Sequence, residues 1–403
     1  MLLRRYPTLA LLSAAQALYW SCSIIGITLT ALVGRSLAPE AWRATLPLAG
    51  TLLAVGPTAR WMQALGRRTA LRRGALLGLA GGLLSAAGLV LGSFALFSLG
   101  CMLVGGYQAS AGFYRFAALE NVAANHKGRA AAWVVAGGMV AALIAPTLAL
   151  HTRHALPVPM AGAYLCIALL AAAAWALLGW LPRDASGPPA GAPAAVSPPA
   201  AAPPTRRQLW QRPALRLALL VTASGHGLMI LAMNATPLAM DGCGHSLAAA
   251  ASVIQWHVLG MFAPSLFAGP AVDRWGARRI AWVGVLLLAA SAGWALAGDG
   301  LWHFLPSSLL LGAGWNCTLL AGTTLLSQAH TPEERSVAQP LMEWSNSAMA
   351  AAMSFASGAL VNTLGWPAIN LAMLAVLTCM AGWLYAHPGR AAAPLQPLAP
   401  PAK

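Results

Sequence analysis

Residues 269–279 read GPAVDRWGARR and join two long apolar runs of the chain. Glycine permits a tight turn and a close contact between helices. A carboxylate such as Asp273 can cap the N-terminus of a neighbouring helix, while the arginines seek acidic partners. A degraded copy, ARWMQALGRR, occupies residues 59–68, with Ala59 in place of the leading glycine and Gln63 in place of the aspartate. The two stretches indicate that the chain consists of two related halves.

The composition excludes an ordinary soluble protein. Of the 403 residues, 59% are hydrophobic and 8% are charged, and the mean hydropathy is +0.67. Soluble domains carry about 25% charged residues, so a normal water-facing surface cannot be built from this chain. A run of about 20 apolar residues spans a bilayer, and the chain has room for about a dozen. We therefore expect an all-α, polytopic membrane protein.

Apolar windows predict twelve transmembrane helices in two pseudo-symmetric bundles of six. The first six cover residues 7–32, 46–65, 74–92, 95–119, 130–150 and 159–181. The second six cover residues 214–238, 248–272, 280–298, 304–327, 339–363 and 367–386. Between them, residues 183–213 are rich in Pro and Ala and predict an extended, weakly ordered linker. The expected domains are therefore 1–182, the linker 183–213, 214–386 and a tail at 387–403.

The net charge of +15 arises from 24 Lys and Arg against 9 Asp and Glu. With the N-terminus placed inside, nearly all the basic residues fall on the cytoplasmic side. Only Arg35, Arg43 and Arg153 fall on the opposite side, and Arg115 lies within a helix. Because basic loops remain in the cytoplasm, we expect both termini there, in a bacterial-type inner membrane. The charge then reflects topology and attraction to the lipid bilayer, and no nucleic-acid partner is expected.

Other function classes lack their signatures. The six cysteines form no CxxC pair, so neither a metal site nor a disulfide framework is expected. No HExxH motif or GxxxxGK[ST] loop occurs, which disfavours a membrane enzyme and an ATP-driven pump. A sensor would normally carry a soluble signalling domain, and none accompanies the apolar runs. The sequence thus favours a transporter of a small molecule, with no cofactor and no enzymatic activity.

The stretch at residues 269–279 resembles motif A of the major facilitator superfamily, and the resemblance extends over residues 7–386 in span count, linker position and repeat. It implies alternating access around a cavity between two six-helix bundles. It also implies a latch that closes the cytoplasmic side, formed by Gly269, Asp273, Arg274, Gly276 and Arg278 in the second half and by Gln63, Gly66, Arg67 and Arg68 in the first. Since Gln63 carries no charge, we expect the first-half latch to be weaker.

Weaker sequence patterns bear on the direction of transport and on the substrate. The fifth span has Ala141, Ala145, Pro146 and Ala149 where the exporter-associated motif C of this superfamily has Gly, Gly, Pro and Gly, which weakens the inference of export. Residues 114–120 and 312–316 resemble those of a bacterial branch that includes siderophore exporters and riboflavin importers. The leading hypothesis is proton-coupled export of a small metabolite such as a siderophore. The alternative is uptake of a riboflavin-like nutrient.

Ionisable groups inside spans point to the mechanism, because placing a charge in hydrocarbon costs on the order of 3 kcal/mol or more unless it faces a cavity or a partner. Glu343 lies eight residues beyond Arg335, roughly 12 Å along a helix, where a carboxyl can exchange protons with both sides. It is the first candidate for proton coupling, against a structural role paired with an arginine. Glu120 is the second candidate, and alternatively receives Arg67 or Arg68. Arg115 is expected to bind an anionic group of the substrate, to pair with Glu343 or Glu120, or to snorkel outward.

The resemblance implies that the first, fourth, seventh and tenth helices surround the substrate path. Each polar side chain on these helices or on the eighth can instead be satisfied between helices. Trp20, Trp256 and Trp344 are candidates to stack on a planar solute. The full set of expected cavity residues is Arg115, Gln16, Gln108, His226, Asn234, Gln255, His257, Trp315 and Asn316.

Overall fold

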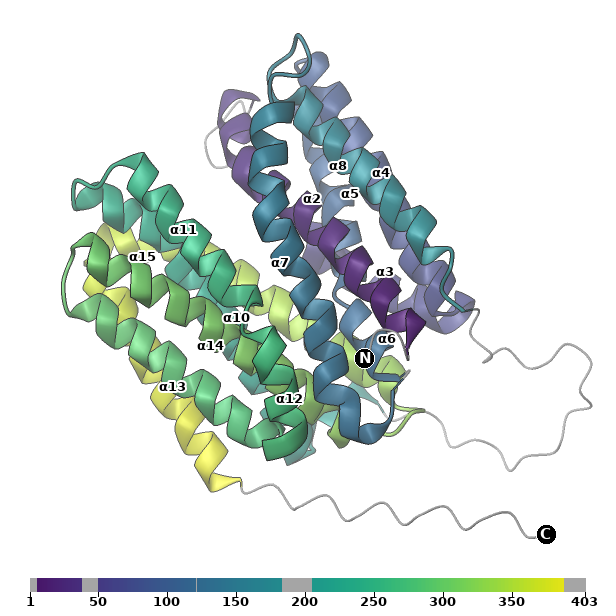
Figure 1. Cartoon of the computed structure of the whole chain (residues 1–403), viewed down its shortest axis with the longest axis vertical. Helices are drawn as coiled ribbons and strands as arrows, with labels where there is room; N and C mark the ends of the chain where they lie inside the picture. The colour runs from purple at the N-terminus through teal and green to yellow at the C-terminus, as the bar shows by residue number, and fades with distance from the viewer. Residues whose placement is uncertain (1–5, 38–49, 121, 183–204, 388–403) are drawn as a thin grey trace, which may run out of the picture.

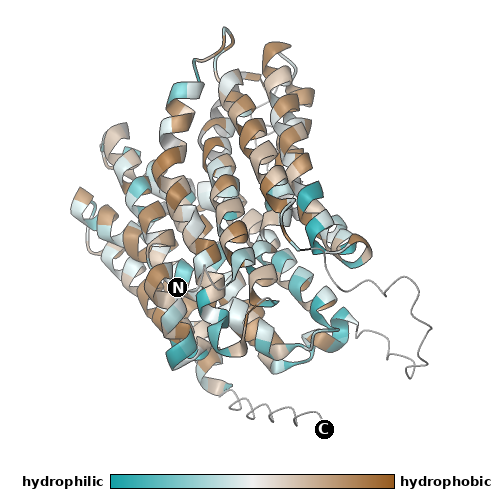
Figure 2. Cartoon of the chain, turned by 45° about the vertical axis from the view of Figure 1, so that its right-hand side comes forward, coloured by the Kyte–Doolittle hydropathy of each residue, from teal (hydrophilic) through white to brown (hydrophobic). Residues whose placement is uncertain are grey.

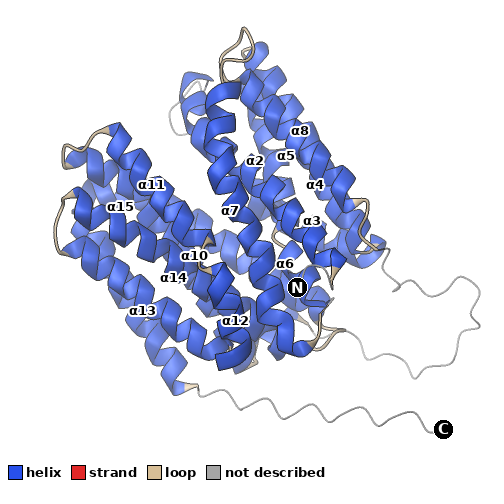
Figure 3. Cartoon of the chain, viewed as in Figure 1, coloured by secondary structure: helices blue, strands red, loops and turns tan. Residues whose placement is uncertain are grey.

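The computed structural model describes residues 6–37, 50–120, 122–182 and 205–387, and within these ranges the regular elements are helices (Figure 3). The first bundle comprises α2 (Pro7–Leu37), α3 (Gly50–Leu65), α4 (Arg67–Val90), α5 (Phe94–Ala111), α6 (Tyr114–Glu120), the 3-10 turn η2 (Ala124–His126), α7 (Lys127–Thr152) and α8 (Ala161–Leu178). The short α9 (Arg206–Trp210) precedes the second bundle, which comprises α10 (Pro213–Gly242), α11 (Leu247–Phe262), α12 (Ser265–Trp275), α13 (Ala277–Leu296), α14 (Leu301–Ala329) and α15 (Arg335–Ala386).

The fold is a multi-pass membrane bundle. Ten segments of the described chain are long and apolar enough to cross a membrane. Two more complete the set of twelve: α3, of which 16 residues are described, and the first part of α15, which contains Glu343. Gly365 has φ 78°, a left-handed conformation that favours glycine, and it divides α15 into two spans. The prediction of an all-helical, two-bundle membrane fold is confirmed.

Both bundles approach each other at one end of the molecule. The start of α2 and the end of α15 lie at this end (Figure 1), and hydrophilic residues gather there (Figure 2). We call it the terminal end. Across the boundary between the bundles, α7 packs on α12 and α11, and α3 packs on α15. Toward the opposite end the ribbons of the two bundles diverge (Figure 1).

Two predicted spans are each interrupted by a bend. The span expected at residues 95–119 is split into α5 and α6 at Gly112, and the span expected at 248–272 is split into α11 and α12 at Pro264. Proline has no N–H to continue the ladder of helical hydrogen bonds. The side chain of Asn316 on α14 steadies the second bend, since its amide donates to the carbonyl of Met261 at 2.7 Å and to Ser265 at 2.6 Å.

The predicted linker contains a short helix. Thr205 caps α9, because its hydroxyl accepts from the amide of Gln208 while the Gln208 side chain accepts from the amide of Thr205. This reciprocal capping box supplies hydrogen-bond partners that the Pro- and Ala-rich composition does not reveal. Residues 183–204 of the linker and 388–403 of the tail lie outside the described residues, so the domain boundaries stay a prediction.

Candidate functional site

A buried ion pair joins the two bundles. A guanidinium nitrogen of Arg115, on α6, contacts a carboxylate oxygen of Glu343, on α15, and the two side chains are only 11% and 10% exposed. The Nε of Arg115 also donates to the hydroxyl of Thr323 on α14 at 3.1 Å. A buried charge is tolerated where a partner of opposite charge compensates it, so neither side chain can lose its partner without penalty. Of the alternatives left open for Arg115, pairing with Glu343 is the arrangement that the structure has.

The break between α5 and α6 makes room for this pair. A Cβ added at Gly112 would collide with a carboxylate oxygen of Glu343 and would lie 3.1 Å from its Cδ. Because Arg115 holds that carboxylate, it cannot simply rotate away. Glycine at position 112 is thus a steric requirement of the ion pair.

Aromatic rings from both bundles meet next to one another. The ring of Trp20, on α2, lies 5.0 Å from that of Phe262 on α11 and 6.4 Å from that of Trp315 on α14, both in edge-to-face geometry. The indole N–H of Trp315 donates to Nδ1 of His226 on α10 at 2.9 Å. We call Trp20, His226, Phe262 and Trp315 the aromatic cluster. Phe262 and Trp315 are buried, so in this state the rings pack on one another across the boundary between the bundles.

Two polar atoms on α2 lie beside this cluster without a hydrogen-bond partner among the described residues. They are the side-chain oxygen of Gln16 and the indole N–H of Trp20, and both are buried. Residues four apart share one face of a helix, so one acceptor and one donor point the same way. Gln108, on α5, is half-buried and its side chain contacts Tyr19.

Other expected cavity residues lie elsewhere. His257 is buried between α11 and α14, where Nδ1 contacts the carbonyl of Ser308 at 3.1 Å. Asn316 uses its side-chain amide for hydrogen bonds at the bend after α11. Asn234 and Gln255 are exposed, and Asn234 donates to Ser354 at 3.1 Å.

The three candidate stacking tryptophans also separate. Trp20 belongs to the aromatic cluster, whereas Trp256 is exposed on α11. Trp344 packs across the bundle boundary, with its ring 3.6 Å from the position of a Cβ built on Gly56. Trp344 is 39% exposed, and it does not belong to the aromatic cluster.

The second-half latch residues form a tight contact between α12 and α7. Asp273 accepts from the backbone amides of Gly128 at 2.7 Å and Arg129 at 3.1 Å, which are the second and third residues of α7. Its carboxylate also lies 3.5 Å from the Arg129 guanidinium. A carboxylate at a helix N-terminus satisfies free N–H groups and the helix dipole. A Cβ on Gly269 would collide with Ala132 and approach the Gly128 carbonyl to 3.0 Å, so this glycine is needed for the close approach.

The remaining second-half residues shape the turn that follows. Gly276, with φ 86°, ends α12 and precedes α13. Arg278 donates to the carbonyls of Leu384 and His387 at the end of α15, and Arg274 is exposed. The latch residues therefore bond within the second bundle as well as across the boundary.

The first-half latch is built differently. Gln63 donates one hydrogen bond to the carbonyl of Ser336 on α15, at 3.0 Å. Arg67 pairs with Glu120 and donates to Gln339 at 2.8 Å, and Gln339 donates to Glu120 at 3.2 Å. Gly66, with φ 76°, occupies the same place before α4 as Gly276 does before α13.

Glu120 therefore lies in a network at the terminal end, where Arg335 also approaches it to 3.4 Å. It does not accompany Glu343 in the buried pair. Arg68 is half-buried and lies in the same region.

A separate ion pair lies just before the first helix of the second bundle. Arg212, just before α10, donates to both carboxylate oxygens of Glu334 at 2.7 Å, and Glu334 also accepts from the amide of Thr331 at 3.0 Å. The hydrogen bonds from Arg212 lower the pKa of Glu334 to about 2. This group lies outside the spans and has no part in the path between the bundles.

Sequence reasoning missed Thr323, Phe262, Gly112 and Gln339. A phenylalanine or threonine in an apolar run predicts packing, and glycine is common in membrane helices, so these three carried no distinguishing signal. Gln339 carried one, because it is a polar side chain at the start of a predicted span. Within the described residues, no three His, Cys, Asp or Glu side chains are grouped so that they could hold a metal ion.

Two six-helix bundles that meet around a buried ion pair form the architecture of a membrane transporter, not of an enzyme. Residues 223–401 match the family model of the Major Facilitator Superfamily. The chain is 37% identical over 369 residues to the riboflavin transporter RfnT of Brucella anthropi, which covers 90% of this chain and 91% of that protein. It is 26% identical over 333 residues to YddS of Bacillus subtilis, an uncharacterised transporter of the same superfamily, covering 78% of this chain and 75% of that one. The chain belongs to the major facilitator superfamily.

Solved structures agree on the fold. The transporter FucP in the outward conformation superposes with a TM-score of 0.73 at 13% identity, over 95% of this chain and 99% of that chain. The proton:xylose symporter XylE gives 0.71 at 13% identity, over 94% and 95%. These structures show the fold alone, whereas the family model and the identity to RfnT confirm the predicted membership of the superfamily.

Proposed function

We propose that the protein imports riboflavin or a closely related flat heteroaromatic nutrient. The observation that carries this proposal is the 37% identity to the riboflavin transporter RfnT over 90% of the chain. Siderophore export, the leading hypothesis from sequence, has no support among these relatives, and the alternative of riboflavin uptake replaces it.

The central chemistry supports a flat solute with polar edges. Riboflavin carries a three-ring system whose edge has carbonyl oxygens and nitrogens. The aromatic cluster offers ring faces and edges, and the unpartnered Gln16 oxygen and Trp20 N–H offer one acceptor and one donor. A site of few polar groups among aromatic rings is typical for such ligands.

Proton coupling is assigned to Glu343. Protonation removes the negative charge that compensates Arg115, so the ion pair between α6 and α15 is broken and the two bundles lose one of their links. A carboxyl at the bundle boundary can thereby tie proton uptake to relative movement of the bundles. The partners of the transporter are then the solute, protons and the bilayer.

We further propose that the terminal end faces the cytoplasm and that the protein lies in the inner membrane. The arginines of the first-half latch and of α9 lie at this end, as the excess of basic residues in cytoplasmic loops requires. The contacts of α12 with α7 and of α3 with α15 then close the cytoplasmic side. The described state is accordingly outward-facing.

The test is uptake of labelled riboflavin by bacterial cells that lack riboflavin synthesis and their own riboflavin carrier. Cells that express the protein should accumulate the label, whereas cells that express Trp315→Ala should accumulate several-fold less. Both strains must show equal amounts of protein in the membrane. No accumulation above the empty vector, or release of a siderophore instead, would contradict the proposal.

A further inference from the structure

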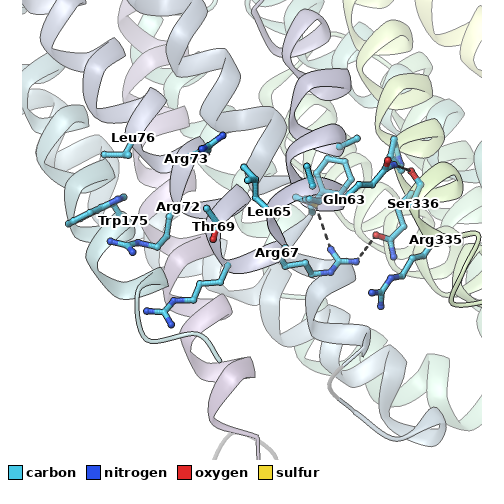
Figure 4. Close-up of a pocket in the computed structure, with 18 residues that line it drawn as sticks. Gln63, Leu65, Arg67, Thr69, Arg72, Arg73, Leu76, Trp175, Arg335 and Ser336 are labelled. Atoms are coloured by element: carbon cyan, nitrogen blue, oxygen red, sulfur yellow. Dashed lines mark hydrogen bonds between the residues drawn. The ribbon is translucent and has the colours of Figure 1, made fainter. Parts of the chain in front are cut away.

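A cavity at the terminal end lies away from the aromatic cluster. It has a volume of about 1010 Å³ and is bounded by α3, α4, α8 and α15 (Figure 4). Its lining includes five arginines and, among the described residues, no carboxylate; the arginines are Arg67, Arg68, Arg72, Arg73 and Arg335. A hollow lined by one sign of charge concentrates ions of the opposite sign.

Only some of these cations are neutralised nearby. Glu120 pairs with Arg67 and lies 3.4 Å from Arg335, so its charge neutralises arginines on the side of the cavity next to α15. In the described part of the chain, no carboxylate pairs with Arg68, Arg72 or Arg73. The cavity therefore retains positive charge on the side of α4.

The Arg72 guanidinium is positioned by stacking, which leaves its N–H donors available for hydrogen bonds. Its guanidinium lies over the ring of Trp175, on α8, at 4.2 Å, and the two side chains lie side by side in Figure 4. Its Nε is buried and has no hydrogen-bond partner among the described residues. Arg73 lies over the ring of Trp61 at 5.8 Å. Stacking fixes both guanidinium groups while leaving donors free for an acceptor.

The opposite part of the lining is apolar. Leu76 lies one helical turn beyond Arg72 on α4, and both Leu76 and Trp175 expose a large part of their surface. Charge toward the terminal end and exposed hydrocarbon one turn deeper match a molecule with an anionic head and an apolar tail. An inorganic ion would make no favourable contact with the apolar part.

We propose that this basic cavity binds the phosphate headgroup of an anionic membrane lipid, with the phosphate at Arg68 and Arg72, which lie four residues apart on one face of α4, and an acyl chain against Leu76 and Trp175. Arginine suits phosphate because its planar group donates two parallel hydrogen bonds. Residues of α15, including Ser336, form the opposite wall of the cavity (Figure 4).

The test uses the purified full-length protein in a neutral detergent. Phosphatidylglycerol, phosphatidylcholine or inorganic phosphate is titrated in, and the midpoint of thermal unfolding is recorded, with lipid retention measured by native mass spectrometry. Phosphatidylglycerol should raise the midpoint and remain bound, whereas phosphatidylcholine and inorganic phosphate at equal phosphate concentration should do neither.

The decisive variant combines Arg68→Gln with Arg72→Gln. Because both charged donors to the phosphate are lost, the apparent dissociation constant for phosphatidylglycerol should rise by about tenfold or more. Arg206→Gln with Arg207→Gln is the matched control, because it removes two exposed arginines of α9 that do not line the cavity. Arg72→Gln alone should give a smaller rise if the double variant unfolds.

Equal binding by the wild type and the Arg68/Arg72 variants would overturn the proposal, as would an equal loss in the α9 control. A midpoint raised as much by inorganic phosphate as by phosphatidylglycerol would overturn the assignment to a lipid.

Discussion

Among single residues, the contact between Arg115 and Glu343 has the largest consequences. Removing one partner of a buried ion pair costs about 3–5 kcal/mol when the other charge remains buried. Thr323 supplies an additional acceptor to Arg115 but carries no charge to replace Glu343. The pair thus links the charge state of one carboxyl to the contact between α6 and α15.

Substituting Glu343→Gln should abolish accumulation driven by a proton gradient while the protein remains folded and inserted. The amide keeps the shape of the side chain but cannot gain or lose a proton. Transport is measured in vesicles with and without an imposed pH gradient, and protein content is matched. Full proton-dependent flux in the variant would remove Glu343 from the mechanism.

Substituting Gly112→Ala should reduce transport by at least tenfold, because the added methyl collides with the Glu343 carboxylate held by Arg115. Overpacking of this kind costs about 1–3 kcal/mol. Gly293→Ala, on α13, is the control, since a Cβ there meets nothing within 4 Å. If both variants transported equally well, Gly112 would have no steric role in the site.

The ion pair of Arg212 and Glu334 predicts a pH dependence of stability. The pKa of Glu334 is about 2 in the folded protein, below the value of about 4.3 expected in the unfolded chain. Its contribution is therefore present above the unfolded value and is lost as the pH falls from about 4 toward 2. Because Arg212 is partly exposed, that contribution is on the order of 1 kcal/mol or less.

Thermal unfolding in detergent checks this prediction. Glu334→Gln should unfold at a lower temperature than the wild type at pH 7, and the difference should shrink as the pH approaches 2. A difference that stays constant over this range would show that the charge of Glu334 does not stabilise the fold.

At the level of helices, the contact between α12 and α7 closes the terminal end. Gly269 allows the helices to approach, and Asp273 then reaches two free amides and the Arg129 side chain. In the related position of the first bundle, Gln63 makes one neutral hydrogen bond to Ser336. The charged contact across the boundary on this side is made instead by Glu120, whose carboxylate lies 3.4 Å from Arg335 of α15.

Asp273→Asn should shift the conformational balance away from the outward-facing state. Asparagine can still accept a hydrogen bond, but it loses the charge that interacts with Arg129 and with the start of α7. Single cysteines introduced on the two faces should become several-fold more reactive on the cytoplasmic face and less reactive on the other. Unchanged reactivity on both faces would contradict a latch role for Asp273.

The helices could be located from sequence because lipid demands long apolar runs, and the predicted spans agree with α7, α8 and α10 to within a few residues. The predicted span begins at residue 74, seven residues after the start of α4 at Arg67, because a basic first turn lies outside an apolar window. The bend at Gly112 could not be predicted, because glycine in a membrane helix usually indicates close packing. Pro264 was a visible signal, but membrane helices also tolerate proline without a break.

For the whole molecule, the internal repeat allowed the two-bundle arrangement to be predicted. It did not decide which side chains meet, because Arg115 and Glu343 are separated by 228 positions and sequence alone left Glu343 and Glu120 as alternative partners. The expected cavity residues also lie in different surroundings, because sequence alone does not show which side chains meet. His226 and Trp315 join Trp20 at the bundle boundary, whereas Asn316 serves a bend and Asn234 lies at an exposed site.

The aromatic cluster lies across the boundary between the bundles. Trp20 comes from the first bundle, and Phe262 and Trp315 come from the second. A solute held there contacts both bundles, so relative movement of the bundles must rearrange its site. This placement is what the proposed transport of a flat nutrient requires.

The most direct test of the central claim is flux through the purified protein in vesicles that contain no other carrier. With an inward proton gradient, the account predicts accumulation of labelled riboflavin that is lost when the gradient is collapsed and in Glu343→Gln. Vesicles that moved no riboflavin in either direction, despite correctly inserted protein, would contradict it.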